Sequence, residues 1–533
     1  MDRIANYLNS HLTGEVVAQE TILEAFSQDR GAFKSRPNSI VFAQNSADIC
    51  KTVCLCSQLA ERGKSLTVSV RGNGNDFTGS TLTSEIIINT SRRFNEIIDF
   101  DPDQALIHVQ SGADLSMINI LAKTQGLSLP VTSTAIKHTI GGVIGNNLIY
   151  PLANKSNLIH RMINQLEVVL ADGTTLQTKR LTKRELNRKI GLQTTEGRIY
   201  REIDKLIEDN QDLINKIDAE AVDNGGYAMI SRVKTANSFD LSPLFVGAQG
   251  TLGVITEAIL NLQDYQPGSV KIWASFSSLV DAMDATDNLL KLKPTALDIY
   301  EHKLFQQAAR RGRSFTTIDE ANKQFENKAA FHLLIELPLK SNFSAKKISK
   351  KIKNIIKAAH GISFEDPADL RTVRDLPQSF DFSDNLYQNI ELAHGAMIPR
   401  VRWRDFTESV AKIETTLGIT LPIYGSALTN ILNLQTLLNL SNMADKQKVI
   451  KLSDSYCRLA TDLNGVVCAS GGEGLAKGMF VHKQMSPELA QLYNQIKQIF
   501  DPQAIFSPEI KKPLDLRNVA GRIASQAKND FSI

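Results

Sequence analysis

Short apolar runs rich in β-branched residues alternate with glycine-rich segments through the first half of the chain. Such runs are typical of strands, and they occur at residues 65–70, 85–89, 105–110 and 164–170. Apolar residues recur at helical spacing in two further segments, 46–63 and 113–125. Residues 182–222 are charged and helical in pattern, without glycine clusters. They predict a helical insertion into a framework of strands.

The pattern changes at Pro267-Gly268, which predicts a domain boundary. Beyond it, strand-like runs separated by helical segments occur near residues 269–276, 295–300, 330–338, 361–365, 395–402 and 420–424. Longer helices are predicted at 441–464 and 486–499. This order favours a second domain with an antiparallel sheet covered by helices, so the predicted fold class is α+β.

The first glycine-rich segment connects the predicted strands 65–70 and 85–89. It contains Arg71, Gly72, Asn73, Gly74, Asn75, Asp76, Phe77, Thr78 and Gly79. A dinucleotide-binding fingerprint would have to open a helix, and this loop leads into another strand instead. Successive backbone N–H groups of such a loop can still bind phosphate. A plain hairpin turn is the alternative.

Two more segments combine glycine with polar residues. One contains Thr139, Ile140, Gly141, Gly142, Val143, Ile144, Gly145, Asn146 and Asn147. The other places Gly247, Gly250 and Gly253 three residues apart, and Val254 and Ile255 then open an alternating strand. Glycine lets the backbone approach another group closely, since no Cβ intervenes. Both segments therefore predict backbone that contacts a ligand.

Composition narrows the class of protein. The 533 residues are 42% hydrophobic and 22% charged, which is typical of a globular chain. A net charge of +3 gives no reason to expect a nucleic-acid partner. Five cysteines are too few for a disulfide scaffold, and we expect a reducing, cytoplasmic setting. The first residues lack a secretory pattern, and no apolar run approaches the roughly 20 residues of a membrane helix.

Taken together, these segments resemble the FAD-linked oxidases of the vanillyl-alcohol-oxidase superfamily, in the branch of the glycolate oxidase subunit and D-lactate dehydrogenase. The resemblance extends over roughly residues 36–510. The family's diphosphate loop matches Arg71 to Gly79, its second flavin loop matches Thr139 to Gly142 with Asn147, and its third motif matches Phe245 to Glu257. Three spaced motifs in the family's order make the resemblance specific.

The resemblance implies a PCMH-type FAD-binding domain of two subdomains and a cap domain. We expect an N-terminal helical segment at 1–35, the FAD-binding domain at 36–266, the cap at 267–499 and a segment at 500–533 that returns to the FAD-binding domain. The residues expected to contact FAD are Arg71, Gly72, Asn73, Gly74, Asn75, Asp76, Thr78, Gly79, Thr139, Gly141, Gly142, Asn146, Asn147, Gly247, Gly250, Gly253, Val254 and Ile255. Some relatives bind FAD covalently through a histidine of the first loop. None is present here, so we expect non-covalent FAD.

The chain departs from the family pattern where the family commonly builds a metal-assisted site. Ser426 and Asn433 stand where histidines are usual, and the later Glu-His-Gly motif reads Gly472-Glu473-Gly474. No two histidines form an i, i+4 pair that could rebuild such a site. We therefore expect no metal ligands.

Three residues are candidates for the chemistry. Arg374 stands where the family's arginine binds the substrate carboxylate, and a guanidinium suits such a contact. The alternative is a surface arginine paired with Asp375, in which case Arg400, Arg402 or Arg404 could serve. His394 lies on a strand expected to face the cap, where a structural histidine is the alternative. Glu473 could act as a base if its pKa is raised, although it would repel an anionic substrate.

The expected reaction is hydride transfer from the CH–OH group of a 2-hydroxy acid, of the D-lactate or glycolate type, to FAD. Electrons would then pass to a quinone, a cytochrome or a soluble carrier. An uncharged alcohol or sugar as substrate is one alternative, and a flavin-binding protein with a decayed catalytic site is another. Residues 345–359 carry six lysines beside an apolar stripe. A solvated helix face explains them, and peripheral contact with the inner face of an anionic membrane is the alternative.

Overall fold

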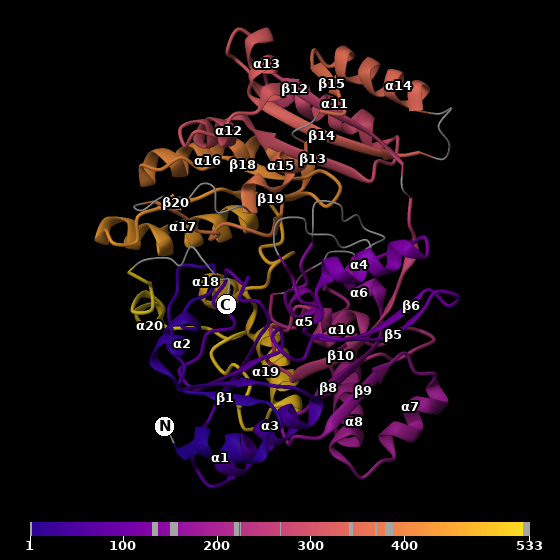
Figure 1. The fold of residues 1–533 in the computed structure, drawn as a ribbon, viewed down its shortest axis with the longest axis vertical. Helices are drawn as coiled ribbons and strands as arrows, with labels where there is room; N and C mark the ends of the chain where they lie inside the picture. Colours follow the sequence, from indigo (N-terminus) through magenta and orange to yellow (C-terminus); the bar gives the residue numbers. More distant parts are fainter. Residues whose placement is uncertain are drawn as a thin grey trace.

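The computed structural model describes residues 3–129, 137–149, 158–217, 223, 225–266, 268–339, 345–367, 370–378 and 387–525. The described residues form three larger sheets, of four and five strands in the first half of the chain and seven strands in the second, and two sheets of two strands each. The seven-stranded sheet lies toward one end of the long axis, and the four- and five-stranded sheets lie beside each other toward the opposite end (Figure 1). The predicted α+β class is confirmed. Pro267 of the predicted boundary and parts of the 182–222 and 500–533 segments lie outside the described residues.

The first sheet has four strands in the order β1 (Glu15–Val17), β2 (Ser39–Phe42), β4 (Ile86–Asn89) and β3 (Val68–Arg71). Strands β2, β3 and β4 run parallel, and every residue of β4 is buried, as expected for a parallel strand covered on both faces. Helix α3 (Ser46–Glu61) packs on this sheet through Ile49, Val53 and Cys56. The segment before residue 36 contains the helices α1 (Arg3–His11) and α2 (Glu20–Ala25). It also contains β1, an edge strand that the sequence pattern did not predict.

The second sheet is antiparallel, in the order β5 (Ile97–Asp101), β6 (Leu106–Gln110), β10 (Val254–Asn261), β8 (Ile163–Val169) and β9 (Thr175–Lys179). Burial alternates strictly along β10, which matches its alternating sequence. Its core also includes residues of α4 (Leu115–Thr124), α5 (Ile140–Asn146), α6 (Ile159–Met162) and α10 (Ser242–Phe245).

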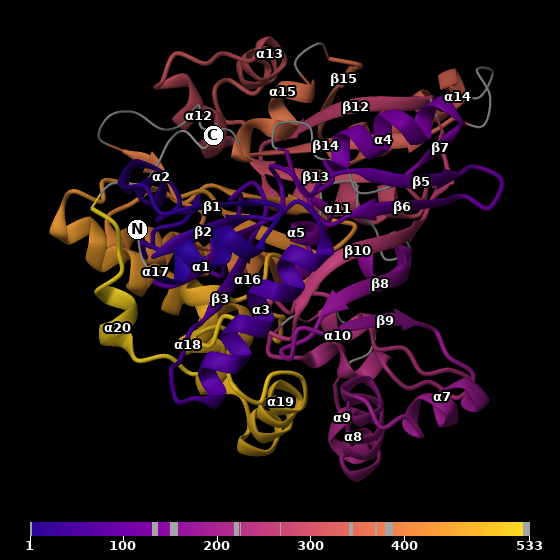
Figure 2. The same ribbon diagram turned by 60° about the horizontal axis from the view of Figure 1, so that its bottom comes forward.

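The predicted insertion is helical. It forms α7 (Lys183–Ile190), α8 (Thr195–Asp209) and α9 (Gln211–Ile214), which project to one side of the second sheet (Figure 2). A capping box at Thr182 and Glu185 starts α7, so the sequence specifies its first turn locally. Tyr200 and Ile203 of α8 are buried against the second sheet's core.

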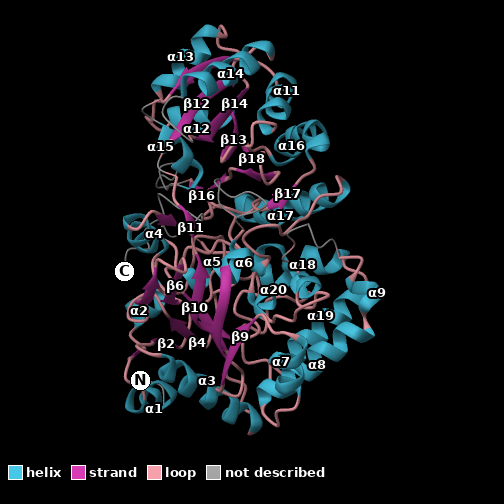
Figure 3. Cartoon of the chain, turned by 90° about the vertical axis from the view of Figure 1, so that its right-hand side faces the viewer, coloured by secondary structure: helices cyan, strands magenta, loops and turns pink. Residues whose placement is uncertain are grey.

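The third sheet has seven strands in the order β15 (Ile362–Glu365), β12 (Ser269–Phe276), β14 (Phe331–Pro338), β13 (Ala296–Glu301), β18 (Ile423–Ser426), β19 (Ile431–Leu434) and β17 (Ala396–Met397), and neighbouring strands are antiparallel. One face packs on α11 (Leu279–Leu290), α14 (Ala345–Ala358), α16 (Trp403–Leu417) and α17 (Met443–Asp462). The other face packs on α12 (His302–Ala309), α13 (Thr316–Gln324) and α15 (Leu370–Asp375). Helices thus cover both faces of this sheet (Figure 3).

The predicted strand 395–402 is wrong in its second half. Strand β17 ends at Met397, and after Pro399 the chain turns through a 3₁₀ segment, Arg400–Arg402, into α16. Proline has no N–H to give to a strand ladder, which is the physical reason for the early end. Strands β5, β9 and β19 were not predicted, since their runs are short or mostly polar.

The last part of the chain returns to the first sheet. Helices α18 (Gly474–Gln484) and α19 (Pro487–Phe500) follow α17, and the chain then runs beside β3. The N–H of Val68 donates to the carbonyl of Ile505 at 2.8 Å, and the N–H of Ser507 donates to the carbonyl of Val68 at 2.9 Å. Helix α20 (Leu516–Ala520) follows. Among all these helices, none within the described residues has the length and apolar character needed to cross a bilayer.

Candidate functional site

A buried arginine, Arg71, packs against the loop that follows β3. Arg71 Nη1 donates to the carbonyl of Phe26 at 3.0 Å, and burial lowers the pKa of Arg71 to about 10. Gly74 has φ +75°, and a Cβ there would lie 2.3 Å from Arg71 Nη2. The loop therefore requires glycine at this position both for its conformation and for its packing. Arg71 lies behind the loop and fixes its shape.

Two buried carboxylates organise the same loop. Asp76 accepts from the N–H of Ser80 at 2.9 Å, and Asp29, from the N-terminal segment, accepts from the N–H of Gly79 at 3.0 Å. Burial, and after it the neighbouring charge of Asp76, raises the pKa of Asp29 well above its usual range. The N-terminal segment is thus part of the site, whereas the sequence suggested only a separate helical segment.

Residues 140–146 form a short helix, α5, and not the open loop that their glycines suggested. Thr139 caps it by accepting from the N–H of Gly142 at 3.3 Å, and Asn147 ends it at φ +42°. Ile140, Val143 and Ile144 are buried on one helical face, which explains why the segment is helical. The third glycine segment joins this helix, since the N–H of Gly247 donates to Ile144 at 2.9 Å.

These segments enclose two adjoining cavities with empty volumes of about 730 and 620 Å³. Both linings include Gly72, Thr81, Gly142 and Asn146, so the two cavities lie side by side. The predicted FAD-contacting residues that line them are Gly72, Asn73, Gly74, Asn75, Asp76, Thr139, Gly141, Gly142, Asn146, Gly250, Gly253 and Ile255. The others lie outside both linings: Arg71, Thr78, Gly79, Asn147, Gly247 and Val254.

The second of these cavities fits a bound group by two independent observations. A Cβ on Gly145 would meet nothing within 4 Å and this glycine has an ordinary helical conformation, so the protein's own structure does not explain it, whereas Gly250 has φ +70° and is required by the backbone. The hydroxyls of Thr81 and Ser111 are buried, line this cavity and have no hydrogen-bond partner. Buried donors are normally satisfied, and a ligand in the cavity would satisfy them. The donors and the glycine backbone suit FAD.

A third cavity of about 510 Å³ lies on the cap side and includes Ile149 and His394, which also line the first cavity. The cap lines it with residues from β13, β18, β19 and α15, namely Asp298, Tyr300, Arg374, Tyr424, Ser426 and Asn433. Ser426 and Asn433, which stand where the family usually has histidines, are thus both at this cavity. Across the described ranges, no three His, Cys, Asp or Glu side chains gather as a metal-ligand set.

Arg374 lines the third cavity and is already paired with two carboxylates. Its Nε lies 3.4 Å from Asp298 Oδ2, and its Nη2 lies 3.3 Å from Glu336 Oε2. Burial works against its charge, but Asp298 and, less strongly, Tyr300 and Glu336 raise the pKa of Arg374 above its usual value. The predicted alternative, a surface arginine, does not describe a side chain only 15% exposed.

The three other candidate arginines of the cap do not lie at this cavity. Arg400 pairs with Asp287 at 2.7 Å, and Arg402 and Arg404 are exposed on the 3₁₀ turn and the start of α16. None of the three lines the third cavity. Arg374 is therefore the arginine at this cavity among the predicted candidates.

His394 stands where the first and third cavities meet. Its ring packs against Phe77 of the first loop with centroids 4.6 Å apart, and its Nδ1 is buried without a hydrogen-bond partner. Burial, and less strongly Lys477, lowers the pKa of His394 to about 3. The imidazole is therefore neutral near pH 7.

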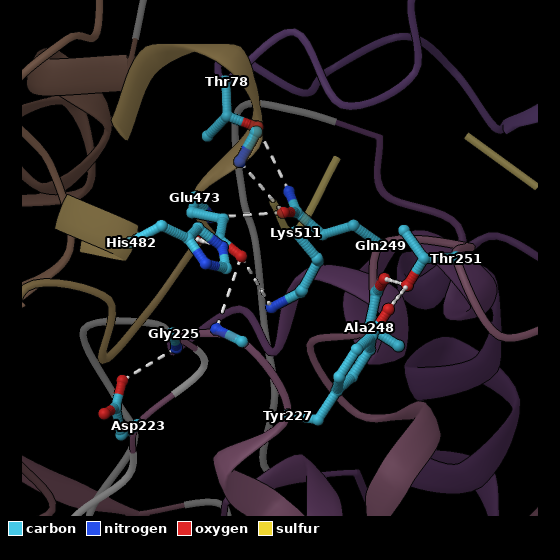
Figure 4. Close-up of polar contacts among 12 residues, drawn as sticks. Thr78, Asp223, Gly225, Tyr227, Ala248, Gln249, Thr251, Glu473, His482 and Lys511 are labelled. Atoms are coloured by element: carbon cyan, nitrogen blue, oxygen red, sulfur yellow. Dashed lines mark hydrogen bonds and ion pairs between the residues drawn. The ribbon is translucent and has the colours of Figure 1, made fainter. Parts of the chain in front are cut away.

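Glu473 lies outside the linings of the three cavities, in a buried cluster shown in Figure 4. Its carboxylate is 3.2 Å from His482 Nε2 and 3.6 Å from Lys511 Nζ, and it accepts from the N–H of Gly226 at 3.3 Å. Burial raises its pKa, but Lys511 and His482 outweigh burial, and the net shift is downward. A carboxylate with a lowered pKa stays ionised, so these contacts suit a structural anion better than a catalytic base.

Gln249 joins the cofactor segments to the Glu473 segment and was not singled out from the sequence. Its Nε2 donates to Thr78 Oγ1 at 3.1 Å and to Asn146 Oδ1 at 3.0 Å (Figure 4). Its Oε1 accepts from the N–H groups of Glu473 and Gly474 at 3.1 and 3.0 Å. All the amide's usual hydrogen bonds are therefore made. Gln249 lies between Gly247 and Gly250 in the sequence, and this position could have identified it as a candidate site residue.

An ion pair between distant segments forms part of the lining of the first cavity. Arg30 Nη2 lies 3.6 Å from Glu391 Oε1, and both side chains are buried in the lining. Burial raises the pKa of Glu391 and lowers that of Arg30, each partly offset by the other's charge. Neither residue belongs to a recognisable motif, and sequence reasoning missed both.

Two family models match the chain. The model of the FAD binding domain matches residues 37–179, and the model of the C-terminal domain of FAD linked oxidases matches residues 269–510. The match covers both sides of the site, since the first model contains the loop after β3 and α5, and the second contains the cap residues of the third cavity.

Known proteins are similar at low identity. D-2-hydroxyglutarate dehydrogenase of Pseudomonas putida is 20% identical over 94% of this chain and 50% of its own length. D-lactate dehydrogenase of Archaeoglobus fulgidus is 23% identical over 84% of this chain and 86% of its own. The solved 4-ethylphenol oxidase from Gulosibacter chungangensis has a TM-score of 0.71 at 13% identity, with 97% of each chain covered. The chain spans about half the length of the D-2-hydroxyglutarate dehydrogenases it matches.

Proposed function

The chain belongs to the FAD-linked oxidases, whose two domains account for residues 37–179 and 269–510, and from this premise we propose that it oxidises the CH–OH group of a 2-hydroxy acid. The D-lactate and glycolate type of acid is the expected substrate. The single observation that carries the proposal is that the cavities adjoin. The FAD-side cavity and the cap cavity share the lining residues Ile149 and His394, so a substrate in the cap would lie next to a cofactor in the FAD-binding domain.

FAD, when bound, accepts the hydride and so supplies the oxidising chemistry. The protein's part is to hold it through the glycine backbone of the loop after β3, α5 and residues 247–253. Thr81 and Ser111 would donate their free hydroxyl hydrogens to it. No histidine occurs in the loop at 71–79, and this supports non-covalent binding.

In the cap cavity, Arg374 is the residue that could bind the carboxylate of an acid substrate. Tyr300, Tyr424 and the buried ring of His394 would position the rest of the molecule and exclude water. Of the expected catalytic residues, we therefore propose Arg374 and His394 as substrate contacts. Glu473 is instead a structural anchor in this proposal.

A second candidate is the oxidation of an uncharged alcohol or sugar, and the ion pairs of Arg374 favour it. Asp298 and Glu336 already compensate the guanidinium, so a further carboxylate would enter a cavity with an excess of negative charge. Uncharged hydroxyl groups would avoid that repulsion.

Anaerobic reduction of the flavin distinguishes these candidates. The FAD-loaded protein is mixed with D- and L-hydroxy acids, alditols and aldoses, and the bleaching of its yellow absorption is followed. Bleaching by one stereoisomer of a 2-hydroxy acid supports the main proposal, and bleaching by alditols or aldoses alone supports the second. A protein that binds FAD but is bleached by none of them would be a flavin-binding protein without this activity.

The electron acceptor and any membrane contact belong to the same proposal. The lysines Lys346, Lys347, Lys350, Lys351, Lys353 and Lys357 are all exposed on α14, while Ile352 and Ile356 face the sheet. Each lysine near an anionic bilayer contributes about 1 kcal/mol of attraction. We propose this helix face as the contact with a membrane that holds a quinone acceptor. Sedimentation with anionic vesicles at low salt, compared with a variant in which four of these lysines are glutamine, tests it. Absence of binding at low salt would leave a soluble carrier as acceptor.

A further inference from the structure

Asp298, the ion-pair partner of Arg374, is a buried carboxylate in the lining of the cap cavity. Asp298 lies on β13, on the sheet face that carries Tyr300 and packs against α15. It is 1% exposed and lines the third cavity, and its carboxylate makes only the long ion pair of Oδ2 with Arg374 Nε, at 3.4 Å. A buried carboxylate is normally hydrogen-bonded several times, because desolvation is otherwise costly. Asp298 therefore keeps unused acceptor capacity in the lining of the cavity where a substrate would bind.

The groups around Asp298 leave its charge only partly compensated. The nearest cation is Arg374 on α15, whose Nε lies 3.4 Å away, and Arg374 is shared with Glu336 on β14. Tyr300 on the same strand, Tyr424 on β18 and the neutral His394 complete the surroundings on the cavity side. Burial raises the pKa of Asp298 to about 7, Arg374 opposes that shift, and Glu336 adds to it.

We propose that Asp298 is the catalytic base, which takes the hydroxyl proton of the substrate during oxidation. This assignment rests on the proposed CH–OH oxidation but holds for an acid or an uncharged alcohol alike. The O–H bond of the substrate breaks and its proton goes to a carboxylate oxygen of Asp298. The C–H bond breaks with both electrons, which reduce FAD, and a carbonyl group forms. A proton released from Asp298 to solvent restores the base.

The other candidates are less suited to this role. The imidazole of His394, with a pKa of about 3, is a weak base near neutral pH, although its free Nδ1 can orient the hydroxyl group. Glu473 is paired with Lys511 and His482 away from the cavity. Ser426, which is directly opposite Asp298 in the pairing of β13 with β18, has no basic group. Asp298 thus supplies a base at a cavity where the usual histidines are replaced.

The test is the pH dependence of flavin reduction in the FAD-loaded full chain, measured by anaerobic stopped flow with the compound found in the screen above. The reaction requires Asp298 in its ionised form, and burial raises its pKa to about 7. The rate of flavin reduction should therefore rise about tenfold per pH unit below pH 7 and become constant above it. In Asp298→Asn the rate should fall by about 10²–10⁴-fold and this pH dependence should vanish. The dissociation constant of FAD should change little, because Asp298 lines the cap cavity and neither of the two cavities on the FAD side. Asp284→Asn, an exposed carboxylate on α11, is the matched control and should behave like the wild type.

The outcomes are separable. If no CH–OH compound reduces the wild-type flavin, the proposed function fails and this assignment fails with it. If the wild type is reduced but Asp298→Asn keeps its rate and pH profile, the base assignment alone is overturned. The pH dependence of the wild-type rate tests the assignment even if the variant does not fold. A rate of flavin reduction that falls only near pH 3, or that does not fall at low pH, would contradict Asp298 as the base.

Discussion

Replacing Glu473 by glutamine separates two readings of this residue, a catalytic base and a structural anchor. The carboxylate is 0% exposed and contacts Lys511, His482 and the N–H of Gly226. Glutamine keeps the volume and can still accept from Gly226, but it removes the negative charge. Lys511 and His482 then remain buried near an uncharged group. Removing one partner of a buried ion pair costs about 3–5 kcal/mol.

The loss of stability in Glu473→Gln should affect both domains, because the segment that contains Glu473 is hydrogen-bonded to the cofactor loops. Gln249 binds the N–H of Glu473 with one end of its amide and Thr78 and Asn146 with the other. We therefore expect Glu473→Gln to lower the free energy of unfolding by about 3–5 kcal/mol at pH 7 and to weaken FAD binding. Denaturant unfolding, followed by flavin release and by circular dichroism, measures both. Glu408→Gln on the exposed face of α16 is the control and should change stability by less than about 0.5 kcal/mol.

The same variant predicts a pH dependence. The pKa of Glu473 is lowered in the folded state, since Lys511 and His482 outweigh the effect of burial. A lowered carboxylate pKa contributes stability that is present above the unfolded pKa of about 4.3 and is lost as pH falls through the folded value. The difference between wild type and Glu473→Gln should therefore be constant above pH 5 and shrink below it. A variant as stable as Glu408→Gln that nonetheless loses turnover would refute the structural role and restore Glu473 as a base.

Three further predictions concern the cofactor and the substrate. Gly145→Leu should abolish FAD binding, because the leucine side chain would occupy cavity space that is open beside Gly145. The variant should not lose stability, since leucine favours a helix over glycine by up to about 1 kcal/mol. Titration with FAD and a thermal melting curve measure the two effects, and Gly145→Ala should weaken binding less. Acid or heat denaturation should release all the flavin into the supernatant, and flavin retained by the precipitate would contradict non-covalent binding. Arg374→Lys should weaken an acid substrate by about 1–3 kcal/mol in a spectral titration, and an unchanged affinity would favour the uncharged substrate.

Local sequence patterns were enough to predict those parts of the candidate site that are contiguous along the chain. The glycines of residues 72–79, 141–142 and 250–253 predicted backbone that approaches a ligand, and parts of these segments line the two adjoining cavities. Glycine is informative in this way because the conformation it permits is a local property. The alternation of β10 and the capping box of α7 were readable for the same reason.

Contacts between side chains of distant segments could not be predicted from the sequence and follow from the folding of the whole chain. Asp298 and Arg374 are in different elements, Arg30 and Glu391 are separated by most of the chain, and no spacing predicts either pair. Glu473 has the sequence context of an active-site residue, yet its role follows from Lys511 and His482, which fold against it. Burial and charge compensation set the pKa of a carboxylate, and both depend on what the rest of the chain places around it. Local pattern therefore identified the segments that line the cavities, and the packing of distant segments determined which acids and bases lie beside them.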